Sequence, residues 1–253
     1  PLTGNQARER LALDSMVTGN YHLYYLSESA LVADFGNRID ESINRKVISM
    51  ANELRNARLP EVLDIIPAYA SVTIQFDPVA LQHRFGSYPD ACAWMESLLT
   101  DAEKVTGQTT AFGRMHRVPV CYESPYSTDL SVLSDQLALT GEEIISLHYS
   151  RSYRVYMLAF LPGFPYMAAV DDRIVCNRKP QPVTTVAGSV GIAGQQTGIY
   201  PVDSPGGWHI IGRTPETVFD ARSNGPFMFA PGDTVEFYPI SANEFKDHQG
   251  RCA

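Results

Sequence analysis

Residues 188–215 read GSVGIAGQQTGIYPVDSPGGWHIIGRTP, and seven of these twenty-eight positions are glycine. From residue 153 onward, short apolar runs alternate with Gly, Pro and Asn-Gly, as in YRVYMLAF, RIVC, WHIIG, FMFA and TVEFYP. Many short strands joined by tight turns are typical of a closed barrel or a sandwich. The stretch predicts an all-β region in which glycine supplies turns and close backbone approach, with a ligand-binding loop as the second interpretation.

The glycines match neither common phosphate-binding motif. A P-loop needs a Gly-Lys pair, which the sequence lacks, because the lysine must reach the phosphates. The dinucleotide fingerprint G-x-G-x-x-G also fails, since Gly188, Gly191 and Gly194 stand three apart and no helical pattern follows.

A serine-hydrolase triad from Asp203, Ser204 and His209 has little support, because the chain contains no G-x-S-x-G elbow. His209 alternates with Trp208 and Ile210 in an expected strand, so its simplest role is a hydrogen-bonded, half-buried imidazole. The six histidines are scattered without an H-E-x-x-H pair, and we expect no metal site.

The segment before the β region has a different pattern. Residues 21–36 and 59–78 each predict a pair of strands, and residues 40–58 and 88–105 predict amphipathic helices. In the first helix, Ile43, Val47, Met50 and Leu54 would line a buried face. The order β-β-α-β-β-α is typical of a two-layer domain with both helices on one face of the sheet.

The expected fold class is therefore α+β. We expect a flexible extension over residues 1–19, a small α/β domain over 20–108 and a β-barrel domain over 109–253 with short helical insertions. In those insertions Thr140 and Glu143 form a capping box that would start a helix.

Composition excludes several classes of protein. The net charge is −8 without a basic run, which argues against nucleic acid as a partner. The four cysteines show no C-x-x-C spacing, the first twenty residues lack the apolar core of a signal peptide, and no stretch is long enough for a membrane helix. We expect a cytoplasmic protein that does not bind membranes.

Residues 159–167, AFLPGFPYM, form a stiff aromatic turn after an apolar strand. The turn is either a rigid corner packed by aromatic rings or a lip that binds a partner. Together with residues 188–215, FLPGFPYM closely resembles the family of the 5-oxoprolinase B subunit, also called allophanate hydrolase subunit 1, which includes the Kip-type inhibitor of a sporulation histidine kinase. With weaker matches the resemblance spans residues 21–240.

The resemblance implies a cyclophilin-like barrel after a smaller α/β domain. It also implies a protein that works with a homologous C subunit, together with an A subunit, to open the lactam of 5-oxoproline at the expense of ATP, with no cofactor bound by this chain alone. The alternatives are a binding module that inhibits a sensor histidine kinase and a carboxyltransferase subunit of allophanate metabolism.

Two segments depart from the family pattern. The basic, proline-rich arm before the glycine run retains only Arg178 and Lys179, and the loop ESPYSTDL at residues 123–130 lacks the glycines of relatives. These departures indicate a divergent substrate or a regulatory role.

Opening a lactam requires groups that polarise its carbonyl oxygen. We expect catalysis by Gln196, His209 and Arg213, the last two supplying positive or donor character, although Arg213 could instead pair with Asp220 and the Gln195-Gln196 pair could be an exposed turn. The expected substrate-binding residues are Arg178, Gln195, Thr197, Tyr200, Gly206 and Gly207. The expected partner-binding residues are Pro162, Gly163, Phe164, Tyr166 and Trp208, in an exposed apolar patch that also includes Phe160 and Tyr200.

Overall fold

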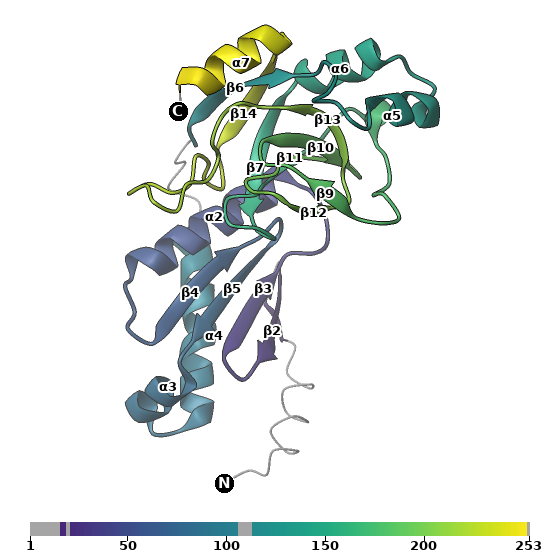
Figure 1. Cartoon of the computed structure of the whole chain (residues 1–253). Coiled ribbons are helices and arrows are strands. Elements are labelled where there is room, and N and C mark those ends of the chain that lie inside the picture. The colour runs from purple at the N-terminus through teal and green to yellow at the C-terminus, as the bar shows by residue number, and fades with distance from the viewer. Residues whose placement is uncertain (1–15, 19–20, 106–112, 252–253) are drawn as a thin grey trace. The chain divides into compact units, whose positions relative to one another are not determined.

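The computed structural model describes residues 16–18, 21–105 and 113–251. The chain divides into two compact units, residues 1–111 and residues 112–253 (Figure 1). The boundary expected between residues 108 and 109 lies outside the described residues. Each unit has a hydrophobic core of its own. None of the helices in the described ranges combines the length and the apolar composition that crossing a membrane requires.

The first unit contains a five-stranded antiparallel sheet with the strand order β1-β2-β3-β5-β4. Helix α2 packs against α4 and against β4 and β5, so the two long helices share one layer. Its strands and helices are β1 (Met16–Thr18), β2 (Tyr21–Ser27), β3 (Ala30–Asp34), α2 (Glu41–Asn56), β4 (Val62–Pro67), β5 (Ser71–Phe76), α3 (Pro78–Phe85) and α4 (Tyr88–Val105).

The predicted face of α2 is confirmed, because Ile43, Val47, Met50 and Leu54 are all buried. Asp40 caps the helix by accepting hydrogen bonds from the Ser42 and Ile43 amides. Two elements of this unit were not expected from the sequence. Strand β1, inside the segment assigned to the flexible extension, pairs with β2, and the short helix α3 follows β5.

The second unit is a closed barrel, as the sequence predicts, with the strand order β10-β11-β8-β7-β14-β6-β13. All its neighbouring strands are antiparallel except β6 and β14. The barrel strands are β6 (Met115–Cys121), β7 (Ser152–Leu158), β8 (Pro165–Ala168), β10 (Ser189–Ala193), β11 (Gln196–Ile199), β13 (His209–Arg213) and β14 (Thr234–Ile240). A separate two-stranded ribbon consists of β9 (Val183–Thr185) and β12 (Ser204–Gly206).

Helices α5 (Leu130–Leu137) and α6 (Gly141–Tyr149) lie between β6 and β7 in the chain, as expected, and α7 (Ala242–Arg251) follows β14 (Figure 1). The capping box of α6 is confirmed: the Thr140 hydroxyl accepts from the Glu143 amide, and the Glu143 carboxylate accepts from the Thr140 amide.

Two expected strands are wrong. In RIVC, the Asp171 carboxylate accepts the Arg173 amide and starts a 3-10 helix, η1 (Asp172–Ile174). In FMFA, the Ala230 amide donates to the Asp233 carboxylate, and only an isolated bridge between Phe219 and Phe227 forms. Side-chain carboxylates thus take backbone donors that a strand ladder would use.

Candidate functional site

The glycines of strands β10 and β11 make room for aromatic rings on the outside of the barrel. A Cβ atom at Gly198 would lie 2.8 Å from the Phe164 ring, and one at Gly191 would lie 3.1 Å from Cβ of Trp208. Val190, Ile192 and Ile199 alternate with these glycines and belong to the barrel core instead. The glycine-rich strands therefore carry a second small core on their outer face.

This outer core buries two of the five residues expected to bind a partner. Phe164 is 1% exposed and Trp208 is 4% exposed, and their rings meet edge to face at 5.3 Å. Tyr200 and Ile210 are buried in the same cluster, and Tyr166 packs against it half-buried. The expected exposed patch is thus wrong for Phe164, Tyr200 and Trp208, because the rings pack on glycine backbone rather than facing solvent.

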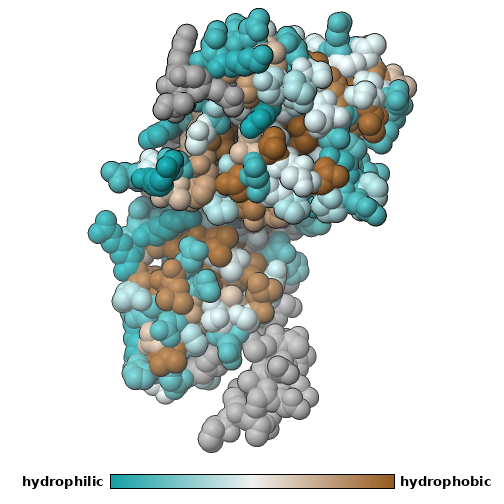
Figure 2. Space-filling view, in the orientation of Figure 1, coloured by the Kyte–Doolittle hydropathy of each residue, from teal (hydrophilic) through white to brown (hydrophobic). Residues whose placement is uncertain are grey.

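The tip of the turn remains at the surface. Phe160 is 65% exposed and Pro162 is exposed, whereas Gly163 is buried against Phe219 and Phe227. Phe160 also adopts a φ of 67°, a left-handed conformation that bulky residues rarely take. Figure 2 shows hydrophobic residues reaching the visible surface of the barrel unit among hydrophilic ones.

Several of the expected polar residues gather at one end of the barrel. His209 of β13 pairs with Ile192 of β10. The next residue of β10, Ala193, pairs with Gln196 of β11 across a tight turn. Gln195, at the tip of this turn, is exposed, and Gln196 is partly exposed. The Gln195-Gln196 pair is therefore a turn at the surface, next in register to His209.

Arg178 is exposed near the same end of the barrel. The two residues before Arg178 both lie at this end. Cys176 forms an isolated β-bridge with Gly194, next to Gln195, and the Asn177 carbonyl bonds to His209. Arg178 lies close enough to the Tyr166 and Tyr200 hydroxyls for its charge to lower their pKa values, against the larger opposite effect of burial. In the part of the chain that the structure describes, no hydrogen bond or ion pair occupies the Arg178 guanidinium.

Arg213 lies apart from His209, at the other end of the same strand. Four residues along a strand span roughly 13 Å, so the two side chains do not converge on one atom. The Arg213 Nε donates to the Ala187 carbonyl at 2.8 Å, and the guanidinium lies 5.8 Å from the centre of the Phe245 ring. The alternative pairing with Asp220 is also not found, because Asp220 pairs with Arg222.

Thr197 points into the barrel core and does not reach the surface. Its hydroxyl donates to the Gly191 carbonyl at 3.1 Å and accepts from Nε2 of His148 at 2.8 Å. Nδ1 of His148 in turn bonds to the Tyr122 hydroxyl at 2.9 Å. Burial lowers the pKa of His148 to about 3, so this histidine is neutral in the folded protein.

The remaining expected substrate-binding residues line the ribbon rather than open space. Gly206 is buried, and a Cβ atom there would lie 2.5 Å from the Tyr200 hydroxyl. Gly207 is partly exposed, and its carbonyl accepts the Lys179 amide at 2.7 Å. Gly206 therefore serves close approach between the ribbon and Tyr200, whereas Gly207 contributes a backbone hydrogen bond.

His209 has the electrostatics of an acceptor rather than of a cation. Its Nε2 lies 3.1 Å from the Asn177 carbonyl, which can only accept, so Nε2 carries the proton. Burial lowers the pKa of His209, with the nearby Lys179 acting in the same direction and Asp129 opposing it. His209 is thus a hydrogen-bond donor at Nε2, one of the two characters expected for it, and its Nδ1 carries a lone pair.

Sequence reasoning missed the ion pair beside His209. Lys179 Nζ lies 2.7 Å from Oδ2 of Asp129, and both side chains are largely buried, at 13% and 18% exposure. Asp129 lies in the segment ESPYSTDL. In the sequence this segment stands out for the glycines it lacks, not for its aspartate. A buried carboxylate paired with a buried lysine is recognisable only once the two segments meet in the fold.

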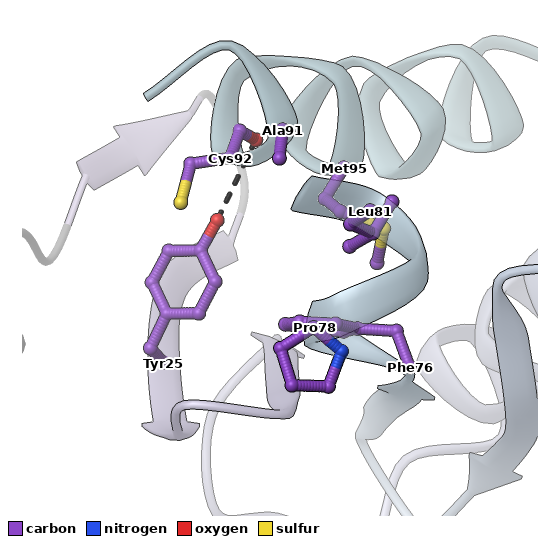
Figure 3. Close-up of a pocket in the computed structure, with 7 residues that line it drawn as sticks. All are labelled: Tyr25, Phe76, Pro78, Leu81, Ala91, Cys92 and Met95. Carbon is purple, nitrogen blue, oxygen red and sulfur yellow. Dashed lines mark hydrogen bonds between the residues drawn. The ribbon is translucent and has the colours of Figure 1, made fainter. Parts of the chain in front are cut away.

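A small apolar pocket lies in the first unit, lined by residues of β2, β5, α3 and α4 (Figure 3). The Tyr25 hydroxyl donates to the Cys92 carbonyl at 3.5 Å across it. The lining residues are Tyr25, Phe76, Pro78, Leu81, Ala91, Cys92 and Met95. None of these residues is charged, whereas the barrel end carries Arg178 and the pair of Lys179 with Asp129, so we place the candidate site at the barrel end. Within the described ranges, no group of His, Cys, Asp and Glu side chains could hold a metal ion.

Comparison with known proteins gives the family of the chain. The family described as "Carboxyltransferase domain, subdomain C and D" matches residues 21–229. The chain belongs to this family. The match confirms the resemblance seen at residues 160–167 and 188–215. It also includes segments of both units of the chain.

Relatives with a named function match this family member over nearly their whole length. The 5-oxoprolinase B subunit of Bacillus subtilis (strain 168) is 34% identical over 90% of this chain and 97% of its own length. The 5-oxoprolinase B subunit of Escherichia coli O157:H7 is 31% identical over 85% of this chain and 94% of its own length.

A solved structure shows the same fold within a longer protein. The crystal structure of TTHA0988 superposes with a TM-score of 0.71 and 34% identity. The alignment covers 84% of this chain and 40% of that chain. This chain therefore spans less than half the length of TTHA0988.

Proposed function

We propose that this chain is the B subunit of an ATP-dependent 5-oxoprolinase, which opens the lactam of 5-oxoproline to glutamate together with the A and C subunits. The supporting observation is coverage: three relatives named as B subunits of 5-oxoprolinase are 31–34% identical and align over 94–97% of their own lengths. Such alignments include both units rather than a shared barrel alone. ATP is used by the assembly, with no cofactor bound by this chain alone.

The barrel end suits the chemistry of a lactam that carries a carboxylate. Arg178 is an exposed cation that can pair with the carboxylate in a charge-assisted hydrogen bond. The side-chain amides of Gln195 and Gln196, at the surface turn, can donate to the ring carbonyl and stabilise the oxyanion as water adds. The C–N bond then breaks and the nitrogen takes a proton, which gives the amine of glutamate.

The same geometry assigns a different role to Arg213. Its guanidinium is bonded to the Ala187 carbonyl and lies over Phe245, at the end of β13 opposite His209. We place Arg213 outside the substrate site, as a side chain that ties the segment before β10 to the barrel.

Partner subunits complete the site, and Phe160 with Pro162 is the proposed contact. Phe160 is exposed and its backbone is left-handed. Such backbone strain costs on the order of 1–3 kcal/mol and is found mainly at functional positions. A sensor histidine kinase as the partner is the alternative proposal. Co-purification separates the two, since the A and C subunits are expected with an enzyme and a kinase with an inhibitor.

Arg178 provides a direct test of the substrate site. In the assembly reconstituted with the A and C subunits, Arg178→Ala should raise the KM for 5-oxoproline at least tenfold, because it removes the cation that holds the carboxylate. Arg222→Ala is the matched control, since Arg222 is also an exposed cation of this unit and its side chain is 93% exposed. An equal KM in wild type and Arg178→Ala would remove Arg178 from the site.

The family description favours a second candidate function, transfer of a carboxyl group to a small amide. A substrate panel separates the two reactions. ATP hydrolysis that depends on 5-oxoproline supports lactam opening, whereas hydrolysis that depends on urea and not on 5-oxoproline supports carboxyl transfer.

A further inference from the structure

Asp129 stands at the start of α5 but does not cap the helix. Aspartate at this position normally accepts a hydrogen bond from the first turn, which stabilises a helix by about 1 kcal/mol. Here the side chain accepts none of the α5 amides. Its Oδ2 accepts instead from the Ile210 amide at 2.7 Å and from Lys179 at 2.7 Å. The carboxylate is thus used to join three segments of the barrel unit.

Each of these segments is bound more than once. The Asp129 amide donates to the Ile210 carbonyl at 2.9 Å, so this residue contacts β13 through both backbone and side chain. The Lys179 amide donates to the Gly207 carbonyl at 2.7 Å, while its ammonium bonds to Asp129. Lys179 is therefore fixed at both ends, although it belongs to a segment without regular secondary structure.

The fixed segment also contains the hydrogen-bond partner of His209. Asn177, two residues before Lys179, presents its carbonyl to Nε2 of His209 at 3.1 Å. An acceptor at Nε2 selects the tautomer with the proton there and leaves the Nδ1 lone pair without a hydrogen. His209 is 5% exposed, and Nδ1 has no hydrogen-bond partner among the described residues. An unpaired buried acceptor costs about 1–3 kcal/mol.

We propose that Asp129 and Lys179 are positioning residues. Their ion pair holds residues 177–179 in place, so that the Asn177 carbonyl fixes the His209 tautomer. That tautomer leaves Nδ1 free to accept a ligand N–H. The ligand part rests on the proposed function, because a lactam carries such an N–H. Since Nδ1 is buried, only a small donor group can be its partner. The bond recovers the cost of the unpaired acceptor when substrate binds.

The test begins with nitrogen-15 NMR of the histidine rings in the chain alone, with His209→Asn to assign the signal. Wild type should show a protonated Nε2 and an unprotonated Nδ1 at pH 7.5. Lys179→Met and Asp129→Asn should each lose this single tautomer, and Lys179→Arg, which keeps the ion pair, should retain it. Lys104→Met is the matched control, because it removes a lysine–aspartate pair of 2.8 Å that is exposed and lies in the other unit.

A protonated Nδ1 in wild type, or an unchanged tautomer in both Lys179→Met and Asp129→Asn, would overturn the proposal. The ligand step is tested in the reconstituted assembly. There Asp129→Asn should lower kcat/KM for 5-oxoproline at least tenfold, and the control Lys104→Met should equal wild type. Normal turnover in Asp129→Asn would overturn this step. The NMR result needs no substrate, so its failure is distinguishable from failure of the proposed function.

Discussion

His148 should make the stability of the barrel unit depend on pH between 7 and 5. Its imidazole is fully buried, bonded to the Tyr122 and Thr197 hydroxyls and stacked on Phe237 with ring centres 4.7 Å apart. Burial lowers its pKa to about 3, whereas a histidine in the unfolded chain titrates near 6.5. Between these values the unfolded state binds one proton more than the folded state, so acid favours unfolding.

The size of the effect follows from linkage. Below pH 6.5 each pH unit lowers the free energy of unfolding by about 1.4 kcal/mol, for as long as the folded histidine stays neutral. From pH 7 to pH 5 the loss from His148 is about 2 kcal/mol. Carboxylates with lowered pKa values, such as Asp171 at about 2, lose their contribution mainly below this window.

The assay is urea unfolding followed by the fluorescence of Trp208. The chain has two tryptophans, Trp94 in the first unit and Trp208 in the barrel unit, so Trp94→Phe leaves a probe of the barrel alone. His148→Gln in this background removes the titrating group and should flatten the difference between pH 7 and pH 5 by about 2 kcal/mol. Equal pH dependence with and without His148 would refute the reasoning, whatever the stability of His148→Gln at pH 7.

The packing of the barrel unit supports three further predictions. Gly198→Ala should lower the free energy of unfolding of the barrel by about 1–3 kcal/mol in urea titrations, because its Cβ meets the Phe164 ring; Gly225→Ala, whose Cβ meets nothing, should not. Thr140→Ala should cost about 1 kcal/mol in the same assay through loss of the capping box, and no change would show that the box is dispensable. Phe160→Ala should weaken binding to the partner subunits at least tenfold in titration calorimetry without changing the unfolding midpoint, whereas unchanged affinity would move the contact elsewhere.

Patterns local in sequence predicted the fold well. The helical spacing of Ile43, Val47, Met50 and Leu54 found the buried face of α2, and Thr140 with Glu143 found the start of α6. Both rest on the spacing of residues within one helix, which the sequence shows directly. The strand expected in RIVC failed because one carboxylate, Asp171, took a backbone donor and turned the chain.

The candidate site was harder to predict, because it depends on contacts between distant segments. Trp208 and Phe164 looked like exposed anchors, since nothing in the sequence says that Gly191 and Gly198 offer a flat surface for their rings. The pair of Asp129 with Lys179 joins residues fifty positions apart. Such a pair has no spacing signature, so only the closed barrel reveals it.

The central claim is that this chain is one subunit of a 5-oxoprolinase, and an omission experiment tests it most directly. ATP hydrolysis that depends on 5-oxoproline is measured with this chain and the A and C subunits together, and with each component left out in turn. The account predicts turnover only in the complete mixture and none from this chain alone. Turnover by this chain alone, or full turnover by the A and C subunits in its absence, would contradict it.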